Sequence, residues 1–346
     1  MPSPFSLLIK PVSWDCNLRC GYCFYTCKSE LFGKGRHIMP MSLLEKLCQE
    51  YLSIPMETHL FCWQGGEPTL AGLPFYRQAV EYMKLYGGKG VNVANALQTN
   101  GTLLNDEWGE FLAEYSFLVG ISIDGPPRIH DHFRKDMQGN GSYHRATSGL
   151  KTLMRHGVPV NALTVVNGHS ANHPLEIYRH LRDDLGIQYH QYIEETITTA
   201  PVTADQWGDF LIAIFDEWVA HDQGRVSVRL FDSIMRIMET GQADSCAMGR
   251  SCNQYLVIEH DGGIYPCDFH VLPEWRLGNL GESPLDAVRE SPLAQRFASR
   301  KLPPKECQNC RFLQYCAADC PRNRCPATKS RLCKGWQRFF SHCLGR

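Results

Sequence analysis

The sequence predicts an α/β fold in which a partial (β/α)6 TIM-like barrel is followed by a cysteine-rich C-terminal module. Strand-like and helix-like segments alternate six times between residues 6 and 222, and such alternation is typical of a parallel sheet with helical crossovers. Beyond about residue 240 this pattern ends, and the chain becomes rich in Pro, Cys, Arg and Gly. We therefore expect a barrel domain over residues 1–235 and a second domain over residues 236–346.

Each of the six units begins with an apolar, β-branched run and continues with apolar residues at helical spacing. The predicted strands cover residues 6–14, 58–65, 91–100, 117–125, 159–167 and 187–195. The predicted helices cover residues 42–54, 74–86, 106–115, 143–157, 174–186 and 204–222. Six units suit an open barrel whose function lies at the C-terminal ends of its strands. A doubly wound sheet is the alternative arrangement.

The second module opens with a predicted hairpin. In YLVIEHDGGIYPC, two apolar runs flank an Asp-Gly-Gly turn signal at residues 261–263. Only short helix-like pieces follow, such as SPLAQRFASR at residues 291–300. The module therefore has too little regular structure to be predicted as a second α/β unit.

The composition excludes several classes of protein. The chain has 346 residues, 43% of them hydrophobic, and a formal net charge of −1, so no overall field attracts nucleic acid or anionic lipid. No apolar run approaches the roughly 20 residues of a membrane span. The N-terminal stretch MPSPFSLLIKPVSW does not have the pattern of a signal peptide. We expect a cytoplasmic protein that binds neither nucleic acid nor membrane.

The 16 cysteines form two groups, with six before residue 63, ten after residue 245 and none between. In a reducing compartment this grouping favours metal binding over disulfides. Three thiolates in a C-x3-C-x2-C motif suit three irons of a [4Fe–4S] cluster and leave the fourth iron free for a substrate. A zinc site or structural thiols are the alternatives. The motif residues are Cys16, Cys20 and Cys23, and the cysteines expected to be structural are Cys27, Cys48 and Cys62.

With these residues the chain resembles the radical S-adenosylmethionine (SAM) superfamily. An aromatic residue precedes the last motif cysteine, and QGGEPTL, QTNGTLL and GISIDGP follow the second, third and fourth strands in the order of that superfamily. The resemblance implies a set of SAM-binding residues, which are Tyr22, Gly65, Gly66, Glu67, Ser122 and Arg134. It also implies an adenine contact after the sixth strand. There QYIEETI departs from the usual apolar pattern, and Thr196 is the candidate, with Ile193 beside it.

The C-terminal cysteines resemble the SPASM module, which carries two auxiliary [4Fe–4S] clusters. The resemblance implies that one cluster is bound by Cys246, Cys252, Cys267 and Cys320. It implies that the other is bound by Cys307, Cys310, Cys316 and Cys333. Cys325 is an alternative to Cys333, and a pair of zinc knuckles is the alternative to the clusters. The chain is thus expected to hold three [4Fe–4S] clusters and SAM.

Over nearly its whole length the chain resembles the anaerobic sulfatase-maturating enzymes, through LLIKP, QGGEPTLAGL, LQTNGTL and YPCDF. The resemblance implies that a 5′-deoxyadenosyl radical removes a hydrogen from Cβ of a Cys or Ser in a sulfatase, giving Cα-formylglycine. It implies that Asp268 is the general base. The expected partners are an unfolded or nascent sulfatase segment, C/S-x-P/A-x-R, and an electron donor such as flavodoxin or ferredoxin.

Two other functions compete with this interpretation. One is a maturase that forms thioether or carbon–carbon crosslinks in a ribosomally made peptide, which Asp268 disfavours. The other is a non-catalytic iron–sulfur protein, which would not need the SAM motifs. The alternative role for Asp268 is structural: its side chain would only form hydrogen bonds at the end of the hairpin.

Overall fold

The computed structural model describes residues 4–195, 200–325 and 328–345. The six predicted barrel strands are all present, and each pairs in parallel with the next. They are β1 (Ser6–Lys10), β2 (Thr58–Trp63), β3 (Asn92–Thr99), β4 (Leu118–Ser122), β5 (Val160–Val166) and β6 (Tyr189–Glu194). Their spatial order is their sequence order. A doubly wound sheet reverses its strand order, so the barrel prediction is confirmed and the alternative is wrong.

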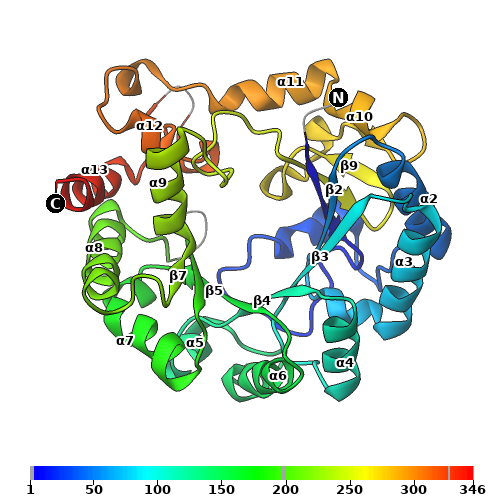
Figure 1. Cartoon of the computed structure of the whole chain (residues 1–346), viewed down its shortest axis with the longest axis horizontal. Helices are drawn as coiled ribbons and strands as arrows, with labels where there is room; N and C mark the ends of the chain where they lie inside the picture. The colour runs from blue at the N-terminus through cyan, green and yellow to red at the C-terminus, as the bar shows by residue number, and fades with distance from the viewer. Residues whose placement is uncertain (1–3, 196–199, 326–327, 346) are drawn as a thin grey trace.

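Helices lie on the outside of this curved sheet (Figure 1). The predicted ones are α2 (Met41–Leu52), α3 (Leu73–Tyr86), α4 (Asp106–Glu114), α6 (Tyr143–Arg155), α7 (Pro174–Arg179) and α8 (Ala204–His221). Local sequence fixes several helix starts. The Asn105 side chain accepts a hydrogen bond from Trp108 N, and Thr203 forms a capping box with Gln206 at the start of α8.

Several elements that precede the second module's hairpin were not predicted. They are the short helices α1 (Ser29–Phe32) and α5 (Pro127–Phe133), the strand β7 (Ser227–Val228) and the helix α9 (Arg229–Thr240). The helix predicted over residues 174–186 keeps its α-helical form only to Arg179, and a π-helical turn follows at His180–Asp184. In this wider turn Arg182 Nη1 lies 2.6 Å from Asp222 Oδ2, beyond α8.

The predicted hairpin forms, but its place in the sheet was not predicted. Strand β8 (Tyr255–Glu259) pairs antiparallel with β9 (Gly263–Tyr265), which pairs with β10 (Gly278–Asn279). Strand β8 also pairs in parallel with β1 along its whole length, from Ser6 opposite Tyr255 to Lys10 opposite Glu259. The ten described strands therefore form one sheet, with β10 and β7 as its edges.

The remaining helices of the second module are α10 (Leu285–Arg289), α11 (Pro292–Ala298), α12 (Leu313–Cys316) and α13 (Cys333–Cys343). Helix α13 packs on α8, where an added Cβ at Gly335 would lie 2.1 Å from Ala204 O. Ion pairs flank this contact, including Lys334 Nζ with Asp205 Oδ1 at 3.0 Å. The second module thus contacts the barrel at both ends, through β8 and through α13.

The predicted division at residues 235 and 236 falls inside α9, and one sheet contains strands from both sides of it. The two domains therefore remain our proposal about sequence organisation. Because β8 adds to β1, residues of the second module come next to the loop that follows β1.

Candidate active site

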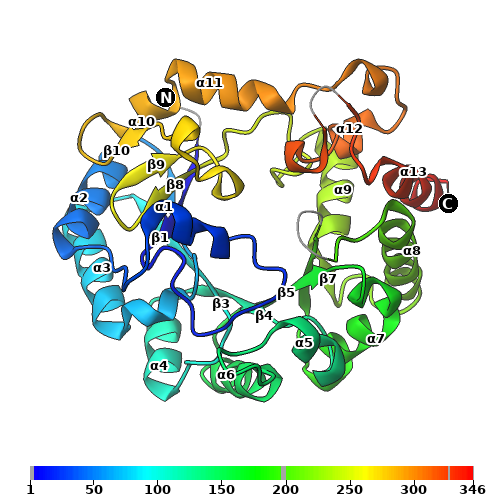
Figure 2. The same cartoon turned by 180° about the vertical axis from the view of Figure 1, so that it is seen from behind.

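The loop that carries Cys16, Cys20 and Cys23 follows β1 and crosses the centre of the ring (Figure 2). Gly21 N donates a hydrogen bond to Phe133 O at 3.0 Å, which fixes the loop to the end of α5. Cys23 N donates to Cys20 O at 3.1 Å, so the chain turns between two predicted ligands. Backbone contacts therefore hold the part of the loop between Cys20 and Cys23.

The surroundings of Cys16 and Cys20 oppose negative charge on their thiols. Burial raises the pKa of Cys20 to about 11, although the charge of Arg134 acts in the opposite direction. Burial also raises the pKa of Cys16, and the charge of Glu67 adds to this effect. A bound metal deprotonates a coordinating thiol outright. The three cysteines therefore fit a site whose thiolates are stabilised by iron.

The glycine motif after β2 lies directly against the cysteine loop. Gly66 N donates to Ser13 O and Glu67 N donates to Asp15 O, both at 2.7 Å. Gly65 has a φ of 140°, which side chains rarely adopt, and an added Cβ at Gly66 would lie 2.0 Å from Asp15 O. Glycine is therefore required at both positions for the close approach of the two loops.

Glu67 holds this turn in place from the inside. Its buried carboxylate accepts hydrogen bonds from Thr99 Oγ1 at 2.7 Å and Asn100 N at 2.7 Å, and from both the N–H and hydroxyl of Thr69. These donors belong to the end of β3 and to the turn itself. These contacts support a positioning role for Glu67 within the predicted SAM site.

Tyr22, Ser122 and Arg134 gather around the end of β4. Arg134 forms a two-pronged ion pair with Asp124, with nitrogen–oxygen distances of 2.9 and 3.0 Å. The Tyr22 hydroxyl donates to the same carboxylate. Ser122 Oγ accepts a bond from Gln98 Nε2 at 3.1 Å. The predicted SAM residues of β2 and β4 therefore lie around one cysteine loop, while Thr196 lies outside the described residues.

Asp268, the predicted base, is buried next to the proposed cluster ligand Cys267. Its Oδ1 accepts hydrogen bonds from the Tyr255 hydroxyl and from Phe269 N, both at 3.1 Å. Its Oδ2 lies 3.9 Å from Nζ of Lys10, the last residue of β1. The side chain is 11% exposed, so the carboxylate faces the interior beside β1 and not bulk solvent.

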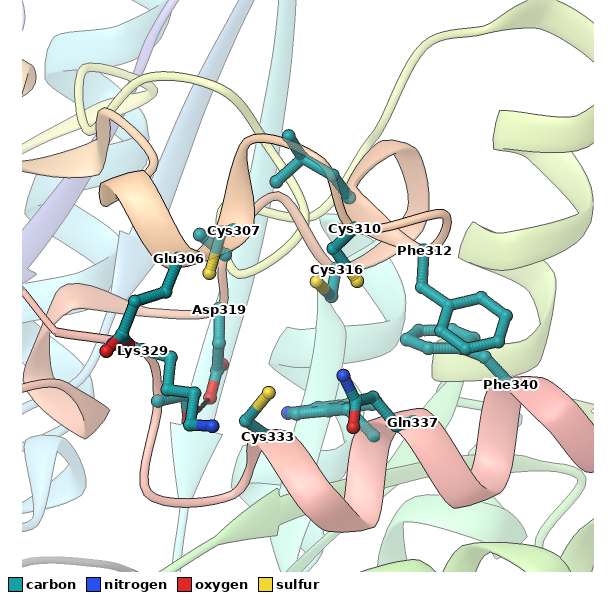
Figure 3. A pocket seen from close by; sticks show the side chains of 14 residues that line it. Glu306, Cys307, Cys310, Phe312, Cys316, Asp319, Lys329, Cys333, Gln337 and Phe340 are labelled. Atoms are coloured by element: carbon teal, nitrogen blue, oxygen red, sulfur yellow. Dashed lines mark hydrogen bonds between the residues drawn. The ribbon is translucent and has the colours of Figure 1, made fainter.

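A cavity of about 190 Å³ in the second module is lined by the cysteines predicted for the second auxiliary cluster. Figure 3 shows the sulfur atoms of Cys307, Cys310, Cys316 and Cys333 directed into it from different segments. The cavity lining includes Cys333 and not Cys325, which is exposed. The geometry therefore supports Cys333 as the fourth ligand.

We predict that Cys333→Ser removes one cluster, about four irons per chain, because it breaks this four-thiolate set. Cys325→Ser is the matched control and should keep the iron content of the wild type. Iron and sulfide analysis of anaerobically purified protein measures both. Iron loss in the Cys325 variant alone would exchange the two assignments.

The first auxiliary set comes from three segments: Cys246 and Cys252 from the loop between α9 and β8, Cys267 after β9, and Cys320 before the turn Pro321–Asn323. Burial is the main cause that raises the pKa of Cys246 and of Cys267. The charge of Cys252 adds to the effect on Cys246, and the charge of Cys320 adds to the effect on Cys267. Throughout the described residues, no three His, Cys, Asp or Glu side chains converge as they would around one metal ion. Cysteines that each bind a different iron lie farther apart than four ligands of one zinc.

Two contacts of this site were missed by the sequence analysis. Lys10 is a charged residue directly after the apolar run Leu7–Ile9 of β1, and that position was the available signal. Arg322 Nη2 donates to Glu194 Oε1 at 2.9 Å, and its guanidinium lies 4.0 Å from the Phe269 ring. It joins the end of β6 to the neighbour of Asp268, and its sequence neighbourhood gave no signal.

Comparisons with known families define the class of protein. The Radical SAM superfamily matches residues 12–181, and the SPASM iron-sulfur cluster-binding domain matches residues 246–311. These matches define a radical SAM enzyme with a SPASM domain. Radical SAM enzymes use a [4Fe–4S] cluster and SAM, and the SPASM domain binds additional iron–sulfur clusters.

Similar proteins specify the family further. The serine-type anaerobic sulfatase-maturating enzyme of Bacteroides thetaiotaomicron is 37% identical over 98% of this chain and 89% of its own length. The cysteine-type enzyme of Clostridium novyi is 35% identical over 99% and 96%. The chain belongs to the anaerobic sulfatase-maturating enzymes.

Solved structures give the same result. The structure of native anSMEcpe with bound AdoMet and Cp18Cys peptide matches with a TM-score of 0.93 and 32% identity, covering 99% of this chain and 98% of that one. The Streptococcus suis protein SuiB, bound to precursor peptide SuiA, shares the fold at a TM-score of 0.67 and 17% identity.

No described helix has the length and apolar character needed to cross a membrane.

Proposed function

We propose that this chain oxidises a Cys or Ser side chain in a sulfatase polypeptide to Cα-formylglycine by radical SAM chemistry. The observation that carries the proposal is the position of Asp268, buried beside the proposed cluster ligand Cys267 and facing Lys10 of the barrel. A base at this place connects the auxiliary cluster site with the barrel interior. The family relatives of both the serine and the cysteine type support the reaction.

The cofactors supply a 5′-deoxyadenosyl radical and an acceptor for one electron. The protein residues bind these cofactors and orient them. Cys16, Cys20 and Cys23 hold the first cluster, and Gly65 and Gly66 let the SAM loop approach it. The other proposed SAM residues are Tyr22, Glu67, Ser122 and Arg134, with Thr196 for the adenine. In this proposal eight further cysteines hold two auxiliary clusters, as assigned above.

Asp268 removes the thiol or hydroxyl proton of the target residue. The target loses a hydrogen atom from Cβ, a proton to Asp268 and one electron to the acceptor, which together make a two-electron oxidation. Serine gives the aldehyde directly. Cysteine gives a thioaldehyde, whose hydrolysis releases hydrogen sulfide and leaves formylglycine. Tyr255 and Phe269 N hold one carboxylate oxygen, so Oδ2 is the one directed toward Lys10 and the target.

The substrate in this proposal is an extended C/S-x-P/A-x-R segment of a sulfatase that has not yet folded. The reaction takes place in the cytoplasm, and a small redox protein such as flavodoxin or ferredoxin donates electrons. An unfolded segment is required because the target Cβ must reach a site enclosed by the barrel and the second module.

Anaerobic incubation of the chain with SAM, a reductant and synthetic C-x-P-x-R or S-x-P-x-R peptides tests the proposal. We expect a mass change that matches conversion of the thiol or hydroxyl to the aldehyde, and no change in a peptide with Ala at the target. From the Cys peptide, a product that keeps its sulfur, has lost two hydrogens and does not react with an aldehyde reagent even after hydrolysis would overturn the proposal in favour of crosslink formation.

A further inference from the structure

The described part of the chain contains three buried lysines, and one of them differs from the other two. Lys28 Nζ donates to Val271 O at 2.8 Å. Lys301 Nζ donates to Ala247 O at 2.6 Å and to Asp319 O at 2.8 Å. Lys10 is 1% exposed, yet within the described residues its ammonium has no hydrogen-bond acceptor. Its nearest carboxylate oxygen, Asp268 Oδ2, lies 3.9 Å away.

A buried ammonium without an acceptor is costly, because it has lost its hydration and gained no equivalent bond. Burial accordingly lowers the pKa of Lys10, while the charges of Asp268 and Glu259 act in the opposite direction. The ring of Tyr25, 4.5 Å from Nζ, offers a further favourable contact. These neighbours oppose the effect of burial, but none of them takes up the hydrogen-bond donors of the Lys10 amine.

The position of Lys10 is central to the proposed active site. Its side chain passes within 3.5 Å of the place where a Cβ on Gly65 would stand, so it borders the SAM loop. The thiols whose charges act on it are Cys267 of the first auxiliary set and Cys23 of the N-terminal motif. The other nearby carboxylate, Glu259, already accepts bonds from the Tyr25 hydroxyl and from His260 N.

We propose that Lys10 is a further catalytic residue, which donates a hydrogen bond to the sulfur or oxygen atom of the target side chain in the substrate peptide. This inference rests on the proposed function. An atom that donates its proton to Asp268 Oδ2 lies about 3 Å from that oxygen. With Lys10 Nζ only 3.9 Å from the same oxygen, one atom can be within hydrogen-bond distance of both groups.

The proposed contact has a consistent role through the reaction. Before proton transfer, the target heteroatom donates to Asp268 and accepts from Lys10, which fixes the side chain at two points. After proton transfer, the negative charge on sulfur or oxygen lies next to the ammonium. A charge-assisted bond to a developing anion is stronger than a neutral one. Lys10 therefore favours loss of the proton without taking the proton itself.

A thermodynamic cycle of peptide affinities tests this proposal without a measurement of turnover. The affinities of a C-x-P-x-R peptide and its A-x-P-x-R analogue are measured by calorimetry with SAM bound, for wild-type protein and for Lys10→Met. We expect the wild type to prefer the Cys peptide by about tenfold or more, because hydrogen bonds to charged groups are among the stronger ones. The preference should fall at least several-fold in the Lys10→Met protein.

Lys28→Met is the matched control, since Lys28 has its own acceptor in the protein. It should lower the melting temperature and keep the preference for the Cys peptide. Lys10→Met should melt at or above the wild-type temperature with its iron content unchanged. Unfolding or cluster loss in Lys10→Met would show that the ammonium supports the fold and would overturn the proposal. An unchanged peptide preference would also overturn it.

The proposed function and this inference fail in different ways. If the wild type converts no peptide to formylglycine, the proposed function is wrong, whatever Lys10 does. If the wild type forms formylglycine and Lys10→Met forms it at the same rate with the same peptide preference, only the role of Lys10 is wrong.

Discussion

Replacement of Cys16, Cys20 and Cys23 by alanine is expected to abolish SAM cleavage completely. Without these thiolates no cluster can pass an electron to SAM, so 5′-deoxyadenosine should fall to the background of the assay. The two auxiliary sites come from separate segments of the second module, and they should remain filled. Iron content should therefore fall by only about four of about twelve atoms per chain, as measured by iron and sulfide analysis.

Cys27→Ala is the matched control for this prediction. Cys27 follows the motif by four residues, in the 3-10 turn Thr26–Lys28, and its exposed thiol donates to Phe24 O at 3.3 Å. The variant should keep full iron content and SAM cleavage. Loss of SAM cleavage in this variant, or zinc without sulfide in the wild-type protein, would contradict the assignment of Cys16, Cys20 and Cys23 as the ligands of the cluster that acts on SAM.

Asp268→Asn is expected to reduce formylglycine formation by about 10² or more, since positioned general bases contribute about 10²–10⁴. Asparagine is nearly isosteric and can still accept the hydrogen bonds from Tyr255 and Phe269 N through one oxygen. It cannot accept the substrate proton at neutral pH. All clusters and the formation of 5′-deoxyadenosine should persist, because cleavage of SAM does not need this base.

The same hairpin provides the control. Asp261 Oδ1 accepts a hydrogen bond from Gly263 N at 2.9 Å, and asparagine can make that bond equally well. Asp261→Asn should therefore keep wild-type activity. If Asp268→Asn kept its clusters and also formed formylglycine at the wild-type rate, another residue would have to be the base.

The barrel could be predicted from the sequence because the patterns that specify its strands and helices are local in the sequence. Each strand and the helix after it carry their own periodicity, and right-handed crossovers then place consecutive strands side by side. The glycine motif could be placed next to the cysteines for the same reason. Gly66 and Asp15 belong to neighbouring strand ends, and the contact between them follows from the order of β1 and β2.

The contacts between the two modules could not be predicted. Strand β8 was recognised as half of a hairpin, but nothing in YLVIE indicates that β1 is its other neighbour. The pairing depends on an open edge left by the barrel and on side-chain fit across a long separation in sequence. The proximity of Lys10 to Asp268 is a consequence of that pairing, and so it was missed as well.

The choice between Cys325 and Cys333 also depended on tertiary structure. Cys325 follows Cys320 by 5 residues and Cys333 follows it by 13, and the sequence alone does not show which of the two is the ligand. The sulfur of Cys333 enters the cavity because α13 begins there and packs on α8. Arg322 shows the same dependence, since its partner Glu194 is set by where β6 ends.

The pairing of β1 with β8 has a consequence for how the chain is made. Strand β1 is synthesised before β8, the strand that covers its other edge, and the about 250 residues between them take roughly 10–50 s at typical elongation rates. Throughout that interval an unpaired strand edge is available for wrong partners. The loop after β1 must also stay ready to receive oxygen-sensitive iron and sulfide. Completion of this enzyme is therefore a late event in its own synthesis, and a truncated chain that ends before Tyr255 keeps an open edge on its first strand.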